Sequence, residues 1–446
     1  MQKQPLTLSK IFIFWLPLAL TWLMMAVEGP FLAAVIARLT DPKFNLAAYG
    51  VAFSFAVFIE SPIIMIMSAS TALVRDKGSF LKLRNFTYAL NALITIIILV
   101  FIIPPVFFLI TRDLIGLPEN VAKLTHYACI FLLPWPGAIG YRRFYQGILI
   151  RSNLTRRVAY GTIVRLSSMG ITALILYSYF RLPGAMVGAL SLSVGVTSEA
   201  IASKIMVRTS VAQLLSKDSK PSSETSLSYG NITAFYYPLA LTSILGLGVH
   251  PMVTFFLGKS FMAIESLAVM PVVSSLVFIF RSMGLSYQEA CIALFGDRNE
   301  GLKMLRNFAV LLGLCVSGGL MLVAFTQISF LWFKGVSGLS LQLTQFSALP
   351  TRILVLLPAL TVLLSFQRSF LVNNKKTRPI TLATSIEVFG ILILLFFTIK
   401  ILGMIGAIAA AISLVSGRFF ANCYLFVPFS KILKNQKHNP NTQDIS

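Results

Sequence analysis

Among the ionisable residues that lie within long apolar stretches of the sequence, five are candidates for chemistry: Glu28, Glu60, His250, Arg281 and Arg352. A charged side chain is costly to bury at the centre of a membrane-spanning helix, so such residues face a cavity or a charged partner. A carboxylate there could bind a cation or a proton, whereas arginine and histidine could bind an anion. We therefore predict that these five residues contribute to a substrate- or ion-binding site.

Glu60 and Arg281 are the most informative of these residues because they occupy equivalent positions in a repeated sequence with an offset of 221 residues. Equivalent positions of the two halves then carry opposite charges. Either the two side chains pair across a central cleft, or each finds a partner within its own helix bundle. Arg281, Arg352 and His250 together would make such a cleft electropositive, which suits an anionic substrate.

Further charged residues in apolar stretches have simpler interpretations. Glu199 and Glu289 lie near the ends of their stretches, where solvent can reach a carboxylate. Arg165 and Arg418 are expected near cytoplasmic helix ends, where they would help to set the topology. Glu387 is a further acidic candidate within a stretch.

Motifs of catalytic and cofactor chemistry are missing from the sequence. It contains no glycine-rich phosphate loop, no His-Glu-x-x-His, no Cys-x-x-Cys and no Gly-x-Ser-x-Gly. The four cysteines are far apart and predict neither a disulfide framework nor a metal site. We therefore predict that the chain is not an enzyme, has no catalytic residues and binds neither metal nor cofactor.

The apolar stretches themselves predict membrane-spanning helices. The 446-residue chain is 57% hydrophobic and only 12% charged, with a mean hydropathy of +0.82, and a helix of about 20 apolar residues crosses a bilayer. No cleavable signal peptide is expected. Twelve spans are predicted, near residues 11–37, 46–73, 86–111, 124–147, 158–180, 184–203, 232–258, 266–295, 307–333, 345–371, 379–399 and 403–430.

The distribution of basic residues predicts the topology. Most of the 37 Lys and Arg residues lie in one alternate set of loops and at the two ends of the chain, including residues 142–157 and 368–378. By the positive-inside rule, both termini face the cytoplasm of an inner (plasma) membrane. The net charge of +22 is therefore a topology signal and does not indicate nucleic-acid binding.

An internal repeat divides the chain into two similar halves. Residues 17–21 (PLALT) recur at residues 238–242 (PLALT), and Pro30 has its counterpart in Pro251 at the same offset. A repeat unit of six helices is inserted twice in the same orientation, which places a cleft between two bundles. We predict an N-terminal lobe (1–209), a cytoplasmic linker (210–230) and a C-terminal lobe with a short basic tail (231–446).

Paired prolines open each half of the repeat. Pro17 and Pro30 in the first span match Pro238 and Pro251 in the seventh. Proline removes a backbone donor and favours a kink. Either these helices are bent for packing, or they line the cleft and act as hinges during transport.

Several short segments resemble known families. The six-plus-six arrangement with a proline in the opening helix of each half resembles the multidrug and toxic compound extrusion (MATE) fold of the wider multidrug, oligosaccharidyl-lipid and polysaccharide exporter (MOP) superfamily. Segments 14–18 (FWLPL), 46–50 (LAAYG), 237–241 (YPLAL) and 349–353 (LPTRI) resemble the progressive ankylosis family. The resemblance implies a V-shaped pair of bundles that exports small molecules by alternating access, and for the ankylosis family it implies anions.

Other families fit less well, and coupling stays open. Segment 74–79 (VRDKGS) lacks the pattern that major facilitator transporters carry between helices 2 and 3. Many MATE relatives carry a coupling aspartate in helix 1, further from the proline than Glu28 lies from Pro17. We predict a monomeric, gradient-driven exporter of small organic or phosphate-bearing anions. The alternatives are an H⁺- or Na⁺-coupled antiporter that extrudes cationic drugs, and a flippase for lipid-linked precursors.

Overall fold

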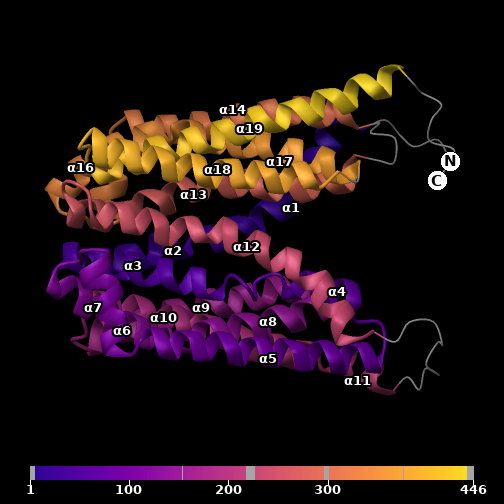
Figure 1. The fold of residues 1–446 in the computed structure, drawn as a ribbon, viewed down its shortest axis with the longest axis horizontal. Helices are drawn as coiled ribbons and strands as arrows, with labels where there is room; N and C mark the ends of the chain where they lie inside the picture. Colours follow the sequence, from indigo (N-terminus) through magenta and orange to yellow (C-terminus); the bar gives the residue numbers. More distant parts are fainter. Residues whose placement is uncertain (1–5, 153, 217–226, 296–300, 375, 439–446) are drawn as a thin grey trace. The chain divides into compact units, whose positions relative to one another are not determined.

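The computed structural model describes residues 6–152, 154–216, 227–295, 301–374 and 376–438, and within these ranges the regular elements are helices (Figure 1). In the part of the chain that the structure describes, eleven helical segments are long and apolar enough to cross a membrane. The chain is therefore an all-helical, multi-pass membrane protein, as predicted.

The difference from the twelve predicted spans falls at residues 124–147. This stretch is divided between α7 (Glu119–Phe131) and α8 (Pro134–Arg151), with a break directly before Pro134. Proline cannot donate the backbone hydrogen bond that a continuous helix would need. In addition, α8 carries Arg142, Arg143 and Arg151, so its composition is less apolar than that of the other segments.

Proline also divides the second predicted span. In the structure α3 (Pro42–Glu60) ends two residues before Pro62, and α4 (Ile66–Leu73) follows after a turn. Pro30 has a related effect in the first span. A proline ring clashes with the carbonyl four residues before it, which here is that of Ala26, and α1 (Leu8–Ala26) ends at this residue. The next helix, α2 (Glu28–Ala37), begins two residues later. Pro17 lies inside α1, and Pro238 and Pro251 lie inside α12. Their role as hinges stays a prediction.

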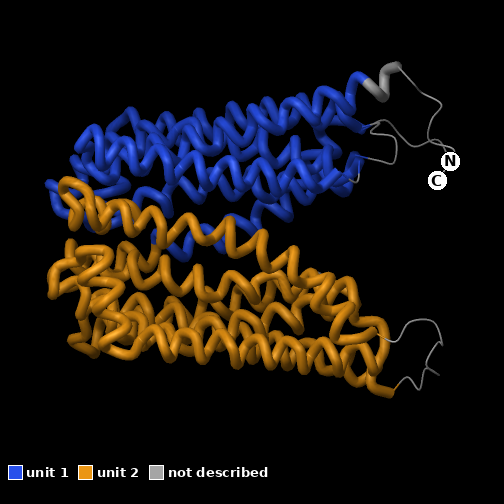
Figure 2. Tube along the Cα trace, viewed as in Figure 1, with its two compact units in different colours: residues 1–30, 272–446 blue, residues 31–271 orange. Residues whose placement is uncertain are grey.

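The chain forms two compact units (Figure 2). Unit 1 comprises residues 1–30 and 272–446, and unit 2 comprises residues 31–271. The division of the repeat into lobes 1–209 and 231–446 stays a prediction. Residues 217–226 of the predicted linker lie outside the described residues.

Unit 2 is built around α10, which packs against α9, α8 and α7, while α3 packs against α7 and α12. This unit contains α3, α4, α7 and α8, most of α2 and the beginning of α13 (Ala263–Leu294). Its other helices are α5 (Lys77–Phe101), α6 (Pro104–Phe108), the π-helical turn Leu109–Leu114, α9 (Thr155–Tyr179), α10 (Gly184–Met206), α11 (Arg208–Ser216) and α12 (Tyr229–Gly258).

Unit 1 is a bundle in which α17 packs against α14 and α19, and α18 packs against α19 (Figure 1). With α1 and the rest of α13, its helices are α14 (Leu302–Phe325), α15 (Ile328–Phe330), the π-helical turn Leu331–Val336, α16 (Leu341–Ile353), the 3-10 turn Leu354–Leu356, α17 (Leu357–Asn373), α18 (Arg378–Phe396), the π-helical turn Phe397–Ile401 and α19 (Gly406–His438).

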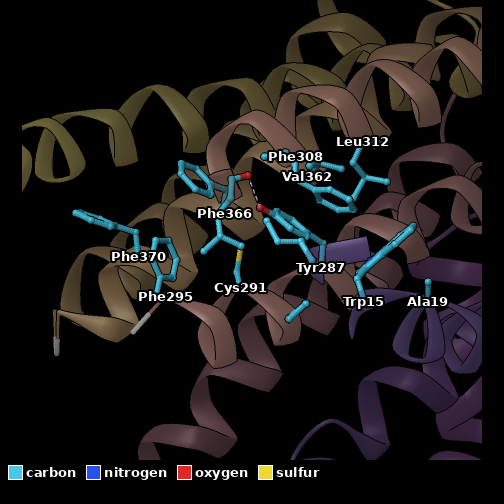
Figure 3. Packing of buried hydrophobic residues seen from close by; sticks show 14 of the residues in the cluster. Trp15, Ala19, Tyr287, Cys291, Phe295, Phe308, Leu312, Val362, Phe366 and Phe370 are labelled. Carbon is cyan, nitrogen blue, oxygen red and sulfur yellow. Dashed lines mark hydrogen bonds between the residues drawn. The ribbon is translucent and has the colours of Figure 1, made fainter. Parts of the chain in front are cut away.

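Trp15 fixes α1 in the core of unit 1 (Figure 3). Its side chain is 6% exposed, and its indole nitrogen donates to the Ser286 hydroxyl at 2.9 Å. The indole also contacts Phe308 edge-on, with ring centroids 5.6 Å apart. The first helix of the chain therefore packs with helices from the second half.

Tyr236 fixes α12 in unit 2 in the same manner. Its hydroxyl donates to the Pro62 carbonyl, and its ring contacts Phe86 edge-on at 5.5 Å. Tyr236 lies 221 residues after Trp15, and Phe308 lies 222 residues after Phe86. The offset found in the sequence thus relates two matching contacts, in which the opening helix of each half packs with helices of the other half.

Replacing Trp15 with Phe should lower stability by about 1 kcal/mol, because the hydrogen bond to Ser286 is lost while most of the ring packing stays. Thermal unfolding of the detergent-solubilised protein measures this. Trp135→Phe is the matched control, because Trp135 is 3% exposed and its buried indole nitrogen has no hydrogen-bond partner among the described residues. Equal losses in both variants would show that the hydrogen bond contributes nothing.

Candidate functional site

A network of buried charges in unit 2 is centred on Glu199 of α10. This carboxylate is 0% exposed and accepts hydrogen bonds from Arg142 and, at 2.9 Å, from the Gln146 amide, both on α8. The Arg165 guanidinium of α9 lies 3.7 Å from the Oε2 atom of Glu199, the same oxygen that accepts from Arg142. Glu199 therefore joins three helices, and its charge is balanced by arginines.

Glu60, at the end of α3, belongs to the same charged region of unit 2. Its side chain is 4% exposed, and its Oε2 atom has no hydrogen-bond partner among the described residues. The guanidinium groups of Arg143, Arg142 and Arg165 act electrostatically on this carboxylate. Three arginines and two glutamates thus lie close together in this part of unit 2.

A second network of charges lies in unit 1. Glu387 of α18 accepts hydrogen bonds from Arg418 of α19, whose Nε and Nη2 atoms lie 2.8 and 2.7 Å from one carboxylate oxygen. Arg418 also donates to the Thr361 hydroxyl of α17 at 3.4 Å. Both side chains of the ion pair are 12% exposed, so the pair is largely removed from solvent.

Two further arginines surround this pair. Arg281 of α13 interacts electrostatically with Arg418 and Glu387, and its Nε atom has no hydrogen-bond partner among the described residues. Arg368 of α17 donates to the Thr384 hydroxyl at 3.0 Å and is also affected by the charges of Arg418 and Glu387. Three arginines therefore share one glutamate, which Arg418 already neutralises.

The two networks each join two consecutive helices of their unit by an arginine-glutamate pair, with the two residue types in opposite order. In unit 2 the arginine lies on α9 and the glutamate on α10, whereas in unit 1 the glutamate lies on α18 and the arginine on α19. Because leaving either partner unpaired in a low-dielectric core is costly, these pairs hold their helices together.

The five predicted site residues do not all fall in one place. Glu60 and Arg281 each lie in the charged network of their own unit, so each has charged neighbours within its bundle. Glu28 is the half-buried first residue of α2, where a carboxylate suits the helix N-terminus. His250 is an exposed residue of α12. Their roles in binding stay predictions.

Arg352 lies apart from Arg281 in unit 1. Its Nε atom donates to the Ala324 carbonyl at 3.3 Å, and its guanidinium lies 5.4 Å from the Phe325 ring centroid. Leu349 and Leu356, one turn to either side, are 48% and 58% exposed, so this side of the helix is an outward apolar face. A shared electropositive cleft of Arg281, Arg352 and His250 therefore stays a prediction.

Apart from Arg281, the arginines that make up these networks are not among the site residues predicted from the sequence. Arg142, Arg143 and Arg368 were expected in cytoplasmic loops, but they lie within α8 and α17. Glu199 was expected near solvent and Arg165 and Arg418 were assigned to topology, but all three belong to buried ion pairs. The available signal was the presence of both signs of charge on neighbouring apolar spans, since intramembrane charges need partners.

Comparison with known proteins supports the fold alone. Neither a protein-family model nor a curated protein matches the sequence. Among solved structures, the chain resembles an inward-facing multidrug resistance MATE family transporter of the MOP superfamily, with 16% identity, coverage of 95% of this chain and 99% of that chain, and a TM-score of 0.71. It also resembles the lipid II flippase MurJ in an inward closed conformation, with 13% identity, coverage of 93% and 87%, and a TM-score of 0.71.

A third similar structure is a MOP superfamily transporter from Pyrococcus furiosus, described as having a binding pocket of reverse polarity that suggests a different function. It shares 14% identity, covers 96% of this chain and 97% of that chain, and has a TM-score of 0.64. The fold is therefore the one found in MATE transporters and in their relatives of the MOP superfamily.

Proposed function

We propose that this protein is a gradient-driven transporter that exports small organic or phosphate-bearing anions by alternating access. The observation that carries the proposal is the excess of arginine in unit 1, where Arg281, Arg368 and Arg418 share the single carboxylate of Glu387. Arginine binds carboxylate and phosphate groups through several directed hydrogen bonds. An anion of two charges would balance the two arginines that Glu387 does not neutralise.

Arg143 in unit 2 supports the same substrate class. Among the described residues it has no carboxylate within hydrogen-bonding distance, and its guanidinium donates a weak hydrogen bond to the Met67 sulfur at 3.9 Å. An amphipathic cation would be repelled by both networks. The resemblance of segment 349–353 to the progressive ankylosis family agrees with anion export, and Glu28, His250 and Arg352 remain proposed contributors.

The efflux of radiolabelled solutes from proteoliposomes tests this proposal. Vesicles loaded with citrate, ATP, pyrophosphate or a lipophilic cation are compared with and without pH and sodium gradients. We expect release of one or more anions and no release of the cation. Release of the cation alone would instead favour drug extrusion, and the gradient that accelerates release identifies the coupling ion.

A lipid-linked anion is the second candidate substrate, favoured by one further observation. An apolar groove of about 380 Å³ lies between α17 and α19, with Leu356, Leu360, Phe419 and Phe420 in its lining. Arg418 directly precedes Phe419, so a phosphate group and an acyl chain could be held by neighbouring parts of unit 1. Transbilayer movement of a fluorescent phospholipid in the same proteoliposomes would distinguish this substrate from a soluble anion.

A further inference from the structure

Two oppositely charged residues from the two halves of the repeat form an ion pair in unit 2. Lys43 lies in the first turn of α3, and Glu265 lies in the first turn of α13. The Lys43 Nζ atom is 2.5 Å from the Glu265 carboxylate, and the two residues are 222 positions apart. The two side chains are 36% and 26% exposed, so solvent reaches the pair.

A second contact between equivalent residues lies further along the same two helices. Gly50 of α3 and Pro271 of α13 are 221 positions apart, and a Cβ atom added to Gly50 would lie 2.4 Å from the Pro271 ring. Only glycine permits so close an approach. Residues at equivalent positions of two related copies touch only near the axis that relates the copies. Thus α3 and α13 meet at that axis through their N-terminal parts.

The backbone before each helix has the same unusual conformation. Asp41 precedes α3 with a φ of 48°, and Met262 precedes α13 with a φ of 53°. These residues are also 221 positions apart. Non-glycine residues adopt the left-handed region only when the surrounding structure holds them there. The beginnings of α3 and α13 are therefore matching, well-defined ends that present Lys43 and Glu265 to each other.

We propose that the Lys43–Glu265 ion pair is a latch between the beginnings of α3 and α13, which opens when alternating access separates the outer ends of these two helices. The predicted topology places the beginnings of α3 and α13 on the non-cytoplasmic side. A partly exposed ion pair is weak enough to break in every transport cycle, because water can solvate both charges. Glu60 and Arg281 are also equivalent in the repeat and lie further along α3 and α13. Unlike Lys43 and Glu265, each of them has charged neighbours within its own unit.

Spin labels at Thr40→Cys and Phe261→Cys measure the state of the latch. These two residues are exposed and equivalent in the repeat, and both precede the latch without belonging to it. Exposed Cys315 and Cys423 are first replaced by Ser. We expect one short distance in the parent protein. In Lys43→Glu, where two carboxylates face each other, the population with a longer distance should rise about two- to fivefold.

The charge-swapped variant Lys43→Glu with Glu265→Lys should restore the short distance. Lys123→Ala is the matched control, since Lys123 forms an exposed pair with Glu119 within α7 at 3.1 Å and should leave the distances unchanged. If Lys43→Glu has the same distances as the parent, or if the charge swap does not restore them, the latch is refuted. The inference rests on the alternating-access part of the proposed function. Because no substrate is needed, its failure would leave the anion specificity untouched.

Discussion

Glu199→Gln should destabilise the protein by about 3–5 kcal/mol, because removing one partner of a buried ion pair leaves an uncompensated charge. Arg142 and Arg165 would both lose the carboxylate that balances them, while Gln146 could still donate to the new amide. Thermal unfolding in detergent, together with the yield of folded protein from membranes, measures the loss. Glu387→Gln should behave in the same way in unit 1, because Arg418 would lose its partner.

Glu119→Gln is the control for this prediction. Glu119 pairs with Lys123 and Arg112 on the surface, and each of these side chains is about half exposed. An exposed pair of this kind contributes less than about 1 kcal/mol. Adding Arg142→Met to Glu199→Gln should recover part of the lost stability by removing one unpaired charge. Equal unfolding temperatures for Glu199→Gln and Glu119→Gln would contradict the structural role of the network.

Arg281→Gln should lower anion efflux about tenfold or more, because a charge-assisted hydrogen bond to an anion contributes about 1.5–3 kcal/mol. Arg281, like Arg368 of the same network, has a buried guanidinium nitrogen without a hydrogen-bond partner among the described residues, but unlike Arg368 it donates no hydrogen bond to a threonine hydroxyl. It can therefore bind a new ligand without breaking such a contact. Initial efflux rates at several anion concentrations measure the effect, and the loss should be largest at low concentration.

Arg112→Gln separates a site effect from a general loss of positive charge. Arg112 lies in the turn after α6, where it pairs with Asp113 at 2.9 Å and is 51% exposed. Its replacement should leave efflux unchanged, and Arg281→Lys should retain part of the activity because the charge is kept. Normal efflux in Arg281→Gln would exclude this residue from the anion site.

The fold could be predicted from the sequence because a bilayer imposes simple requirements on length and composition. Runs of apolar residues located the spans, and the repeated PLALT segment indicated two related halves. The packing of α1 with the second half could not be predicted. In the sequence, Trp15 is one apolar residue among many, and nothing there indicates its contacts with Ser286 and Phe308.

The charged networks were only partly predictable, because an arginine in a cytoplasmic loop and an arginine in a buried ion pair look the same in the sequence. Arg142 and Arg143 lie close to Arg151 and Arg157 in sequence, so they were assigned to one loop. The structure separates them because α8 continues to Arg151 and buries its Arg142 side against α10. Glu60 and Arg281 stand out in the sequence because each is an isolated charge in an apolar stretch, whereas their charged neighbours come from other helices.

The position of α1 in unit 1 has a consequence for biosynthesis. The residues that α12 contacts through Tyr236, Pro62 and Phe86, precede it in the chain and have been made when α12 is synthesised. By contrast, Trp15 bonds to the carbonyl of Met283, a residue made 268 positions later. At about 5–20 residues per second, α1 waits roughly 13–50 seconds in the membrane before its partner helices are synthesised. Unit 2 can therefore fold first, whereas α1 packs into unit 1 only after the helices of the second half have been synthesised.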